Sequence, residues 1–380
     1  MRLDLPPVGR GIDLRGSAAR SVSASLARTG WDSGASVDSA ATGRSDGFVK
    51  AIVYTRYGGP DVLHLADVPT PAAGDRQILI KVRAAEATKS DCELRSFRYA
   101  VRWLWLPLRI AFGITRPRRR ILGGYFAGEV VSVGGRVTSF APGDRVYGSA
   151  GLRLGAYGEY IVLPEDAAIA CKPRNMTFAE AAAVPLGGLN ALHFVQRASI
   201  KPGEQVLING AGGSIGAHAI QLAHSMGAQV TAVDHGIKQD LVRRLGADDF
   251  IDYTIDDVTT TGRTFDVIFD MVPGSPYRRL IGMLQPGGRY LNGNPRLSVL
   301  LRSALTTRLT DKTVTVAFAP ETKQALATIT EMIEAQKIQS IVDRIYPMSQ
   351  AVAAHRRVET EQRQGAVVIT IGEPDEPAEP

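Results

Sequence analysis

Three glycines, Gly210, Gly213 and Gly216, come directly after a short apolar run and before a stretch with apolar residues at helical spacing. A strand, a glycine turn and a helix in this order offer the free N–H groups and the positive dipole end of the helix to a phosphate. A glycine triplet alone is weak evidence, and the spacing is GxxGxxG rather than the commoner GxGxxG. Because the flanking runs fit, we predict that this turn, with Ser214 and Ile215, binds the pyrophosphate of a dinucleotide. A turn that binds no phosphate is the alternative.

Asp234 ends the next apolar run, which begins at Gln229. It follows the glycines by about 20 residues, where a carboxylate binds the ribose hydroxyl groups of NADH and repels the 2′-phosphate of NADPH. This acid favours NADH. Lys238, four residues further on, could pair with Asp234 or be a solvated helix residue.

The composition is that of an ordinary globular protein with one basic segment. The length of 380 residues predicts two domains, and the hydrophobic fraction of 44% is typical of a soluble chain without a membrane span. Eight arginines and no acid lie between Glu93 and Glu129, which exceeds the whole net charge of +6. Since the remainder is nearly neutral, we do not expect a nucleic-acid-binding protein.

Cysteine and histidine are sparse. The two cysteines, Cys92 and Cys171, form no CxxC, and the six histidines form no HxxxH or HExxH. We therefore expect no cysteine-rich zinc site. The sparse cysteines also favour a reducing, cytoplasmic location.

The elements that must position these residues fall into two halves. Residues 1–47 are rich in Ser, Ala, Gly and Arg, so we expect a disordered N-terminal extension; acids nearly balance its arginines, which argues against a transit peptide, and a start site placed too far upstream would give the same pattern. Short β-rich runs separated by Gly- and Pro-containing turns follow from Phe48. From Gln205 onward, predicted strands and helices alternate, which indicates a parallel sheet covered by helices on both faces. The predicted elements are 205–210, 213–226, 229–233, 237–245, 265–271, 275–284, 288–292 and 313–318, then a helix over 321–334 and a strand over 366–371.

Several motifs resemble those of the medium-chain dehydrogenase/reductase superfamily. GEVVSVG from Gly128 and VTSFAPGDRV from Val137 resemble its GxVxxVGxxVxxFxxGDxV signature, and AAAVPLGGLNA from Ala181 resembles the helix entry below the nicotinamide. The resemblance covers nearly all of residues 48–372 and is strongest to the zinc-independent quinone oxidoreductase branch, including the mitochondrial reticulon-interacting oxidoreductases. It implies an α/β fold with a GroES-like, β-rich catalytic domain and a Rossmann domain with a doubly wound parallel sheet.

This resemblance implies domain boundaries and a dimer. We expect the GroES-like domain at 48–173, completed by 320–372, the Rossmann domain at 174–319, and a solvated acidic tail at 373–380. The predicted edge strand 313–318 is where members of the superfamily often dimerise, so a homodimer is expected.

The residues at the zinc positions of the superfamily are not metal ligands. Thr88 replaces the zinc-binding cysteine, and Gly123-Gly124-Tyr125 replaces Gly-His-Glu. We therefore predict no metal, which removes the Lewis acid that alcohol oxidation uses. What remains is hydride transfer from a reduced nicotinamide to a small hydrophobic quinone or α,β-unsaturated carbonyl compound. A nucleotide-binding protein that acts without catalysis in redox sensing or at a membrane, and a true alcohol dehydrogenase, are the alternatives.

The resemblance also suggests site residues. Tyr99 and Tyr125 are candidate proton donors, and Thr88 lies beside the expected nicotinamide. Asp91 and Arg95 match a family pair that is either structural or catalytic. Departures from the family are Glu93 in place of a tyrosine and Asn190 in place of a threonine.

The nucleotide contacts that the resemblance implies are Asn190 and Asn292 near the nicotinamide, and Lys238 with Tyr253. The latter two match residues that hold the 2′-phosphate in NADPH-dependent relatives, so they oppose Asp234. Because one lysine would not offset a buried like-charge contact, NADH is still favoured over NADPH.

The arginine-rich segment 95–120 has three possible roles. Its apolar residues, among them Trp103 and Trp105, could form a lid over a hydrophobic acceptor, rest on an anionic membrane surface, or pack on their own domain. A lid is favoured over the membrane surface.

Overall fold

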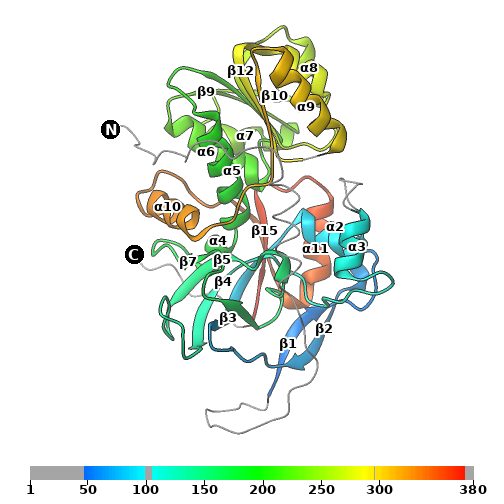
Figure 1. The fold of residues 1–380 in the computed structure, drawn as a ribbon, viewed down its shortest axis with the longest axis vertical. Helices are drawn as coiled ribbons and strands as arrows, with labels where there is room; N and C mark the ends of the chain where they lie inside the picture. Colours follow the sequence, from blue (N-terminus) through cyan, green and yellow to red (C-terminus); the bar gives the residue numbers. More distant parts are fainter. Residues whose placement is uncertain (1–46, 99–104, 295, 373–380) are drawn as a thin grey trace.

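The computed structural model describes residues 47–98, 105–294 and 296–372. Two sheets lie one above the other along the long axis, with helix α5 running between them (Figure 1). The predicted α/β class, with one antiparallel-rich and one parallel sheet, is confirmed.

The upper sheet is entirely parallel and has the strand order β10-β9-β8-β11-β12-β13. This is the doubly wound order, in which the connections change direction between β8 and β11, and ligands of such sheets bind at the carboxyl ends of the strands at this point. The short central strands are apolar because helices cover both faces of the sheet. The strands are β8 (Gln205–Asn209), β9 (Gln229–Asp234), β10 (Asp249–Asp252), β11 (Phe265–Asp270), β12 (Leu284–Asn292) and β13 (Thr313–Val316).

The helices of this half are α5 (Pro185–Ala198), α6 (Ser214–Ser225), α7 (Gln239–Arg244), α8 (Tyr277–Gly282) and α9 (Leu297–Leu309). Helix α9 differs from the others because none of its residues is buried. Leu297, Leu301, Leu305 and Leu309 repeat every four residues and are 55–77% exposed. The helix lies beside β13, which is an edge strand of the sheet.

The lower sheet has the order β14-β15-β3-β4-β5-β7, and β6 pairs with the first half of β3. Only β14 and β15 pair in parallel. The strands are β3 (Gln77–Ala87), β4 (Tyr125–Val133), β5 (Arg145–Ser149), β6 (Tyr160–Pro164), β7 (Ile169–Cys171), β14 (Val342–Pro347) and β15 (Ala366–Thr370); β1 (Phe48–Val53) and β2 (His64–Pro69) form a separate hairpin-like pair. The helices of this lower half are α2 (Lys89–Ser96), α3 (Trp105–Phe112), α4 (Phe178–Ala182), α10 (Lys323–Glu334) and α11 (Ala351–Glu359).

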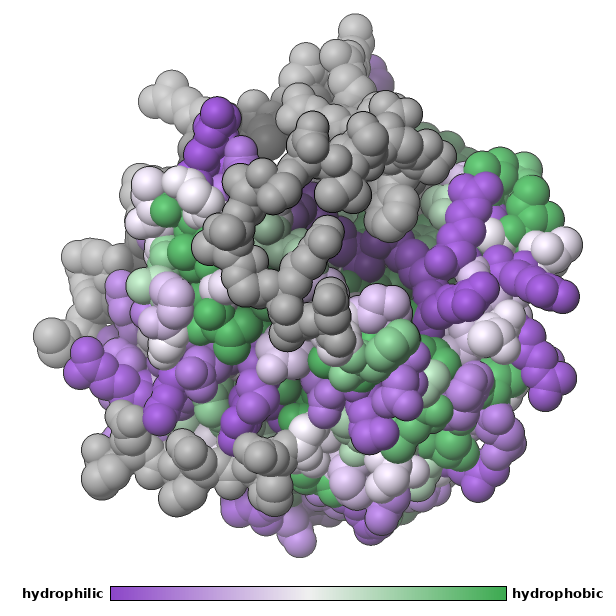
Figure 2. Space-filling view, turned by 90° about the horizontal axis from the view of Figure 1, so that it is seen from below, coloured by the Kyte–Doolittle hydropathy of each residue, from purple (hydrophilic) through white to green (hydrophobic). Residues whose placement is uncertain are grey.

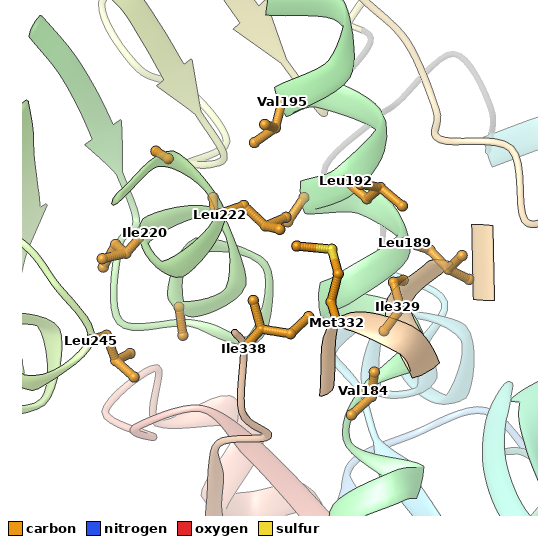
Figure 3. Close-up of a cluster of buried hydrophobic side chains, with 14 of the residues drawn as sticks. Val184, Leu189, Leu192, Val195, Ile220, Leu222, Leu245, Ile329, Met332 and Ile338 are labelled. Carbon is orange, nitrogen blue, oxygen red and sulfur yellow. The ribbon is translucent and has the colours of Figure 1, made fainter. Parts of the chain in front are cut away.

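A hydrophobic core joins the two halves. Residues of α5 and α6 pack against α10 and against Ile338, with Leu192, Leu222, Ile329 and Met332 at the centre (Figure 3). Helix α4 packs on β3 and β4 of the lower sheet, although it follows the expected domain boundary at 173. One continuous core therefore joins the helices of the two halves.

Hydrophilic and hydrophobic residues are interspersed on the face at the β1–β2 end of the molecule (Figure 2). Among the described residues, no helix is both long and apolar enough to cross a membrane.

Candidate functional site

The glycine turn after β8 has the conformation that a nucleotide-binding turn requires. Gly210 has a φ of +84°, which side chains rarely tolerate. At Gly216, a Cβ would lie 2.3 Å from the Gly210 carbonyl oxygen, so glycine lets α6 pack directly on the turn. At Gly213 the nearest atom to a Cβ would be 3.7 Å away, which leaves space beside the helix start.

Helix α6 begins at Ser214, after Gly213 as its N-cap, and no side chain caps it. Its first turn, Ser214, Ile215 and Gly216, therefore presents backbone N–H groups and the positive end of the helix dipole. The Ser214 hydroxyl is buried and has no hydrogen-bond partner among the described residues. These features fit the diphosphate of a dinucleotide.

Asp234 and Lys238 form a buried ion pair beside the turn, with Lys238 Nζ 2.9 Å from Asp234 Oδ1. Asp234 also accepts hydrogen bonds from the backbone N–H groups of Gly212 and His235, each at 2.8 Å. The Lys238 stem lies across Gly212, where a Cβ would be 2.4 Å from Lys238 Cδ. Of the two alternatives for Lys238, pairing with Asp234 is what the structure shows.

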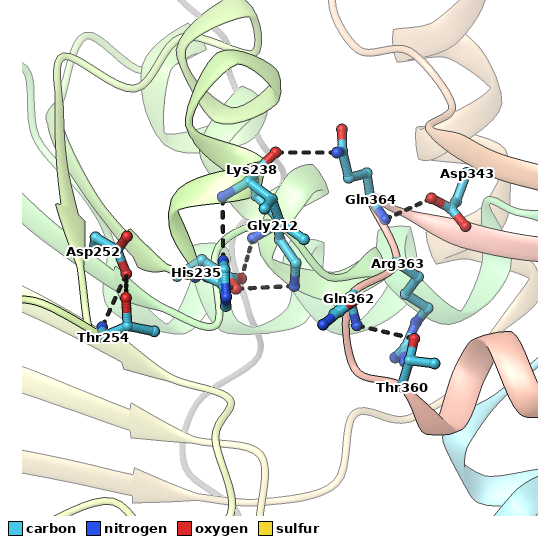
Figure 4. A network of polar contacts seen from close by, with 12 residues as sticks. Gly212, His235, Lys238, Asp252, Thr254, Asp343, Thr360, Gln362, Arg363 and Gln364 are labelled. Carbon is cyan, nitrogen blue, oxygen red and sulfur yellow. Dashed lines mark hydrogen bonds and ion pairs between the residues drawn. The ribbon is translucent and has the colours of Figure 1, made fainter.

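The loop between α11 and β15 closes over this region (Figure 4). Gly365 N donates to the Gly212 carbonyl oxygen at 3.1 Å, and Gln364 Nε2 donates to the Ile237 carbonyl oxygen at 3.1 Å. No local sequence pattern marks this loop as part of the site, because its contacts span more than 120 residues.

Tyr253 lies at the rim, 58% exposed, with its ring edge-to-face with His235 at 6.1 Å. It is near the Asp234–Lys238 pair, since Tyr253 N donates to the Asp234 carbonyl oxygen at 3.3 Å. Lys238 and Tyr253, which are far apart in sequence, thus flank the same end of β9.

The two predicted asparagines already have intramolecular partners. Asn190 Nδ2 donates to the Leu186 carbonyl oxygen within α5 at 2.9 Å. Asn292 is buried, and its Nδ2 donates to Asp270 Oδ2 at 3.2 Å while its Oδ1 accepts from Asn294 N at 2.7 Å. Contact between either side chain and a nucleotide stays a prediction.

Thr88 caps α2 from the lower domain. Its hydroxyl accepts from Asp91 N at 3.0 Å and donates to Asp91 Oδ2 at 2.6 Å, in a capping box. Asp91 also accepts from Gly123 N at 3.0 Å. Arg95 pairs with Glu359, and no ion pair joins it to Asp91 among the described residues. Asp91 and Arg95, which match the family pair, therefore do not form an ion pair with each other.

Tyr125 is half-buried at the start of β4, and its hydroxyl donates to Glu321 Oε1 at 2.7 Å. Ser149, opposite Tyr125 on β5, donates to Glu321 Oε2 at 2.6 Å. Burial and the Glu321 carboxylate hold the pKa of Tyr125 well above its ordinary value. Glu321 lies on the segment between β13 and α10, and sequence reasoning missed it because the contact spans 196 residues. Tyr99 lies outside the described residues.

A buried polar chain lies behind Thr88 and Asp91. Tyr157 Oη is 3.4 Å from Asp91 Oδ2 and 3.1 Å from His355 Nε2, and His355 Nδ1 is 3.4 Å from Cys92 Sγ. Burial lowers the pKa of His355 to about 3 and raises that of Cys92 to about 12, so both groups are neutral at pH 7. The chain holds Asp91, and through it Thr88, in place.

Part of the arginine-rich segment forms α3. Arg109 lies over the rings of Tyr57 and Phe97, each centroid 4.3 Å from its guanidinium carbon. Trp105, Leu106 and Ile110 are about half exposed. Residues 99–104, with Trp103, lie outside the description. The role of the segment as a lid stays a prediction.

Thr88 and Gly124 stand where zinc-dependent members of the superfamily carry cysteine and histidine ligands. The Thr88 hydroxyl is bound to the Asp91 carboxylate, and Gly124 has no side chain that could ligate a metal. The described part of the chain contains no group of three or more His, Cys, Asp and Glu side chains that could hold a metal ion.

Comparisons with known proteins match both halves of the chain. A family model described as "Alcohol dehydrogenase GroES-like domain" matches residues 74–173, and one described as "Zinc-binding dehydrogenase" matches residues 245–369. A 2-methylene-furan-3-one reductase of Solanum lycopersicum is 31% identical over 84% of this chain and 79% of that protein. An NADPH-dependent alkenal/one oxidoreductase, chloroplastic, of Arabidopsis thaliana has the same identity and coverage. The solved quinone oxidoreductase of Coxiella burnetii is 28% identical, with a TM-score of 0.76 over 86% of this chain and 100% of that one.

Proposed function

This chain belongs to the medium-chain dehydrogenase/reductase superfamily, in its quinone oxidoreductase-like branch, and from that premise we propose that it is an NAD(P)H-dependent reductase of quinones or α,β-unsaturated carbonyl compounds. The observation that carries the proposal is the start of α6, which directly follows the glycine turn and which no side chain caps, with the Ser214 side chain buried beside it. A bound dinucleotide would place its diphosphate there and supply a hydride from its reduced nicotinamide.

Tyr125 is the candidate proton donor among the described residues. The reduced acceptor carries negative charge on oxygen, which a hydrogen-bond donor stabilises. The raised pKa of Tyr125 keeps its phenol protonated at neutral pH, and its hydroxyl would turn from Glu321 to the acceptor. The Thr88 hydroxyl proton is bound to Asp91 instead, which favours a positioning role for Thr88.

We propose NADH as the preferred nucleotide. Binding a 2′-phosphate with Lys238 would take the lysine from Asp234 and leave a buried carboxylate without its counter-charge. The Arabidopsis relative is named for NADPH, so the direct comparison of both nucleotides is the decisive one.

We also propose that the reductase works without zinc, because Thr88 and Gly124 replace the zinc-binding residues of the superfamily. We propose a cytoplasmic location, and its support is the small number of cysteines, two in 380 residues. A homodimer is supported by two neighbouring features, the edge strand β13 and the exposed leucines of α9.

The test is the rate of NADH and of NADPH oxidation with a panel of quinones and enones, with metal content measured on the same sample. We expect turnover with NADH preferred and no stoichiometric zinc. Tyr125→Phe should lower kcat by about 10²-fold or more, as loss of a general acid does, while the nucleotide Kd stays unchanged.

Nucleotide binding without turnover across the panel would instead support the non-catalytic alternative. One zinc per chain together with alcohol oxidation would support an alcohol dehydrogenase. Unchanged kcat in Tyr125→Phe would exclude this residue as the donor.

A further inference from the structure

Helix α3 carries large apolar side chains that the described part of the chain leaves exposed. Trp105, Leu106 and Ile110 of the helix, and Ile114 just beyond its end, are 46–61% exposed. Leu106 and Ile110 are one helical turn apart, so they lie on the same side of α3. The helix lies at the outer edge of the molecule (Figure 1). Packing on its own domain, one of the roles considered for this segment, does not account for these four side chains.

Other side chains fix α3 to the domain. Phe112 is buried, and the Arg109 guanidinium lies over the rings of Tyr57 and Phe97. The Tyr57 hydroxyl donates to the carbonyl oxygens of Phe112, at 3.1 Å, and Gly113, at 2.8 Å. The exposed side chains therefore belong to a helix that is held in place by its other residues.

Exposed arginines follow the end of this helix. Arg118 N donates to the Phe112 carbonyl oxygen at 2.8 Å, which folds the loop after α3 back onto the helix end. Arg116, Arg118 and Arg120 are exposed, and none of them forms an ion pair with an acid among the described residues. The sequence has no Asp or Glu between Glu93 and Glu129 that could neutralise them locally. We call the combined apolar and basic residues the α3 surface: Trp105, Leu106, Ile110, Ile114, Arg116, Arg118 and Arg120.

The charge of the α3 surface decides which partner fits it. A second copy of this chain, bound about a two-fold axis, would bring the same arginines together and repel. An anionic lipid bilayer supplies both things that the surface needs. Its headgroups attract arginines, and tryptophan and aliphatic side chains insert at the boundary between headgroups and acyl chains.

We propose that the α3 surface binds the protein peripherally to an anionic lipid bilayer, with Trp105, Leu106 and Ile110 inserted at the headgroup boundary. Each arginine close to such a membrane raises the affinity roughly fivefold, and the inserted apolar area adds to this gain. The inference does not depend on the proposed reductase activity, since none of these residues belongs to the nucleotide site.

The test is co-sedimentation of the full chain with vesicles of phosphatidylcholine alone or of phosphatidylcholine mixed with phosphatidylglycerol. We expect binding to the mixed vesicles only, and weaker binding when salt rises from roughly 0.05 M to roughly 0.5 M, because salt screens exposed charges. Arg116→Gln with Arg118→Gln should weaken binding by about 30-fold. Leu106→Ser with Ile110→Ser should weaken it by about tenfold or more, although the net charge is unchanged.

Matched controls remove the same groups elsewhere on the surface. Arg243→Gln with Arg244→Gln changes two exposed arginines of α7, and Ile255→Ser with Ile345→Ser changes two exposed isoleucines. Both controls should bind vesicles as the wild type does. Thermal unfolding and light scattering of each variant show whether its fold and its oligomeric state are kept.

No binding of the wild type to mixed vesicles at low salt would overturn this inference, whether or not the variants fold. An equal loss of binding in the controls would also overturn it, because the attraction would then come from the net charge of the whole protein. Binding that Leu106→Ser with Ile110→Ser leaves unchanged would refute insertion. Reductase turnover without vesicle binding would refute this inference alone, and vesicle binding without turnover would refute only the proposed function.

Discussion

His355 is a buried imidazole in a chain of polar residues, and it makes the stability of the protein sensitive to acid. Its folded-state pKa of about 3 lies below the ordinary value of 6.5. Between these values the unfolded chain binds more protons, so the free energy of unfolding should fall as pH falls from about 6.5 towards 3, by up to about 1.4 kcal/mol per pH unit.

Urea unfolding at several pH values checks this expectation. His355→Gln should have a shallower acid limb than the wild type, whatever its stability at neutral pH. His64→Gln, at an exposed histidine, should keep the wild-type slope. If the free energy of unfolding changes with pH in the same way in the wild type and in His355→Gln, the ring takes up its proton in the folded state as readily as in the unfolded state.

Residue pairs close in sequence were more predictable than distant ones. Asp234, at the end of β9, and Lys238, in the short turn that follows, are only four residues apart, so the sequence offers their pairing as an alternative. The partner of Tyr125 is not predictable in this way, because Glu321 lies 196 residues away in the sequence and reaches it only through the tertiary fold. The residue types alone gave no distance between them.

At the level of elements, the turn between β8 and α6 depends on Gly216 for the close packing of α6 and on Gly213 for the space beside the helix start. Gly216→Ala would place a Cβ 2.3 Å from the Gly210 carbonyl oxygen, an atom of the backbone. The helix would have to shift, and we expect a loss of about 1–3 kcal/mol in the free energy of unfolding.

Gly213→Ala is the comparison for this change. Its φ of −86° suits alanine, and its Cβ would be 3.7 Å from the nearest atom, so stability should be nearly unchanged while nucleotide binding weakens. Thermal unfolding and nucleotide Kd are the measurements. Equal stability of both variants would mean that α6 does not pack on the turn as described.

The parallel strands were predicted well because buried strands are continuous apolar runs bounded by glycine or charge. Residues 205–209 and 229–234 lie within one residue of the predicted bounds. Helix α9 was missed because it buries no residue, and its leucines repeat on an exposed face. The sequence pattern shows which residues are apolar, but not which other element covers them.

At the scale of the whole molecule, the leucines of α9 and the edge of β13 favour a symmetric dimer. Each leucine buried in an interface contributes about 1.5–3 kcal/mol, and two-fold symmetry makes every substitution count twice. Leu301→Glu with Leu305→Glu should therefore convert the protein to a monomer.

Light scattering during size exclusion measures this outcome. Ile255→Glu is the control, since Ile255 is 78% exposed and follows β10 at the opposite edge of the parallel sheet. A wild-type monomer, or a dimer that the leucine substitutions leave intact, would contradict the expectation.

The place of β15 affects the order in which the protein is completed during synthesis. This strand lies inside the lower sheet, between β14 and β3, yet it is built from residues 366–370. The ribosome makes β3 to β7 first, but their sheet lacks an inner strand until residues 366–370 have been made. The half with the parallel sheet has all its strands by residue 316 and can close before β15 is made, so the domain that is begun first is finished after it. A nascent chain exposes the unpaired β3 edge until β15 has left the ribosome.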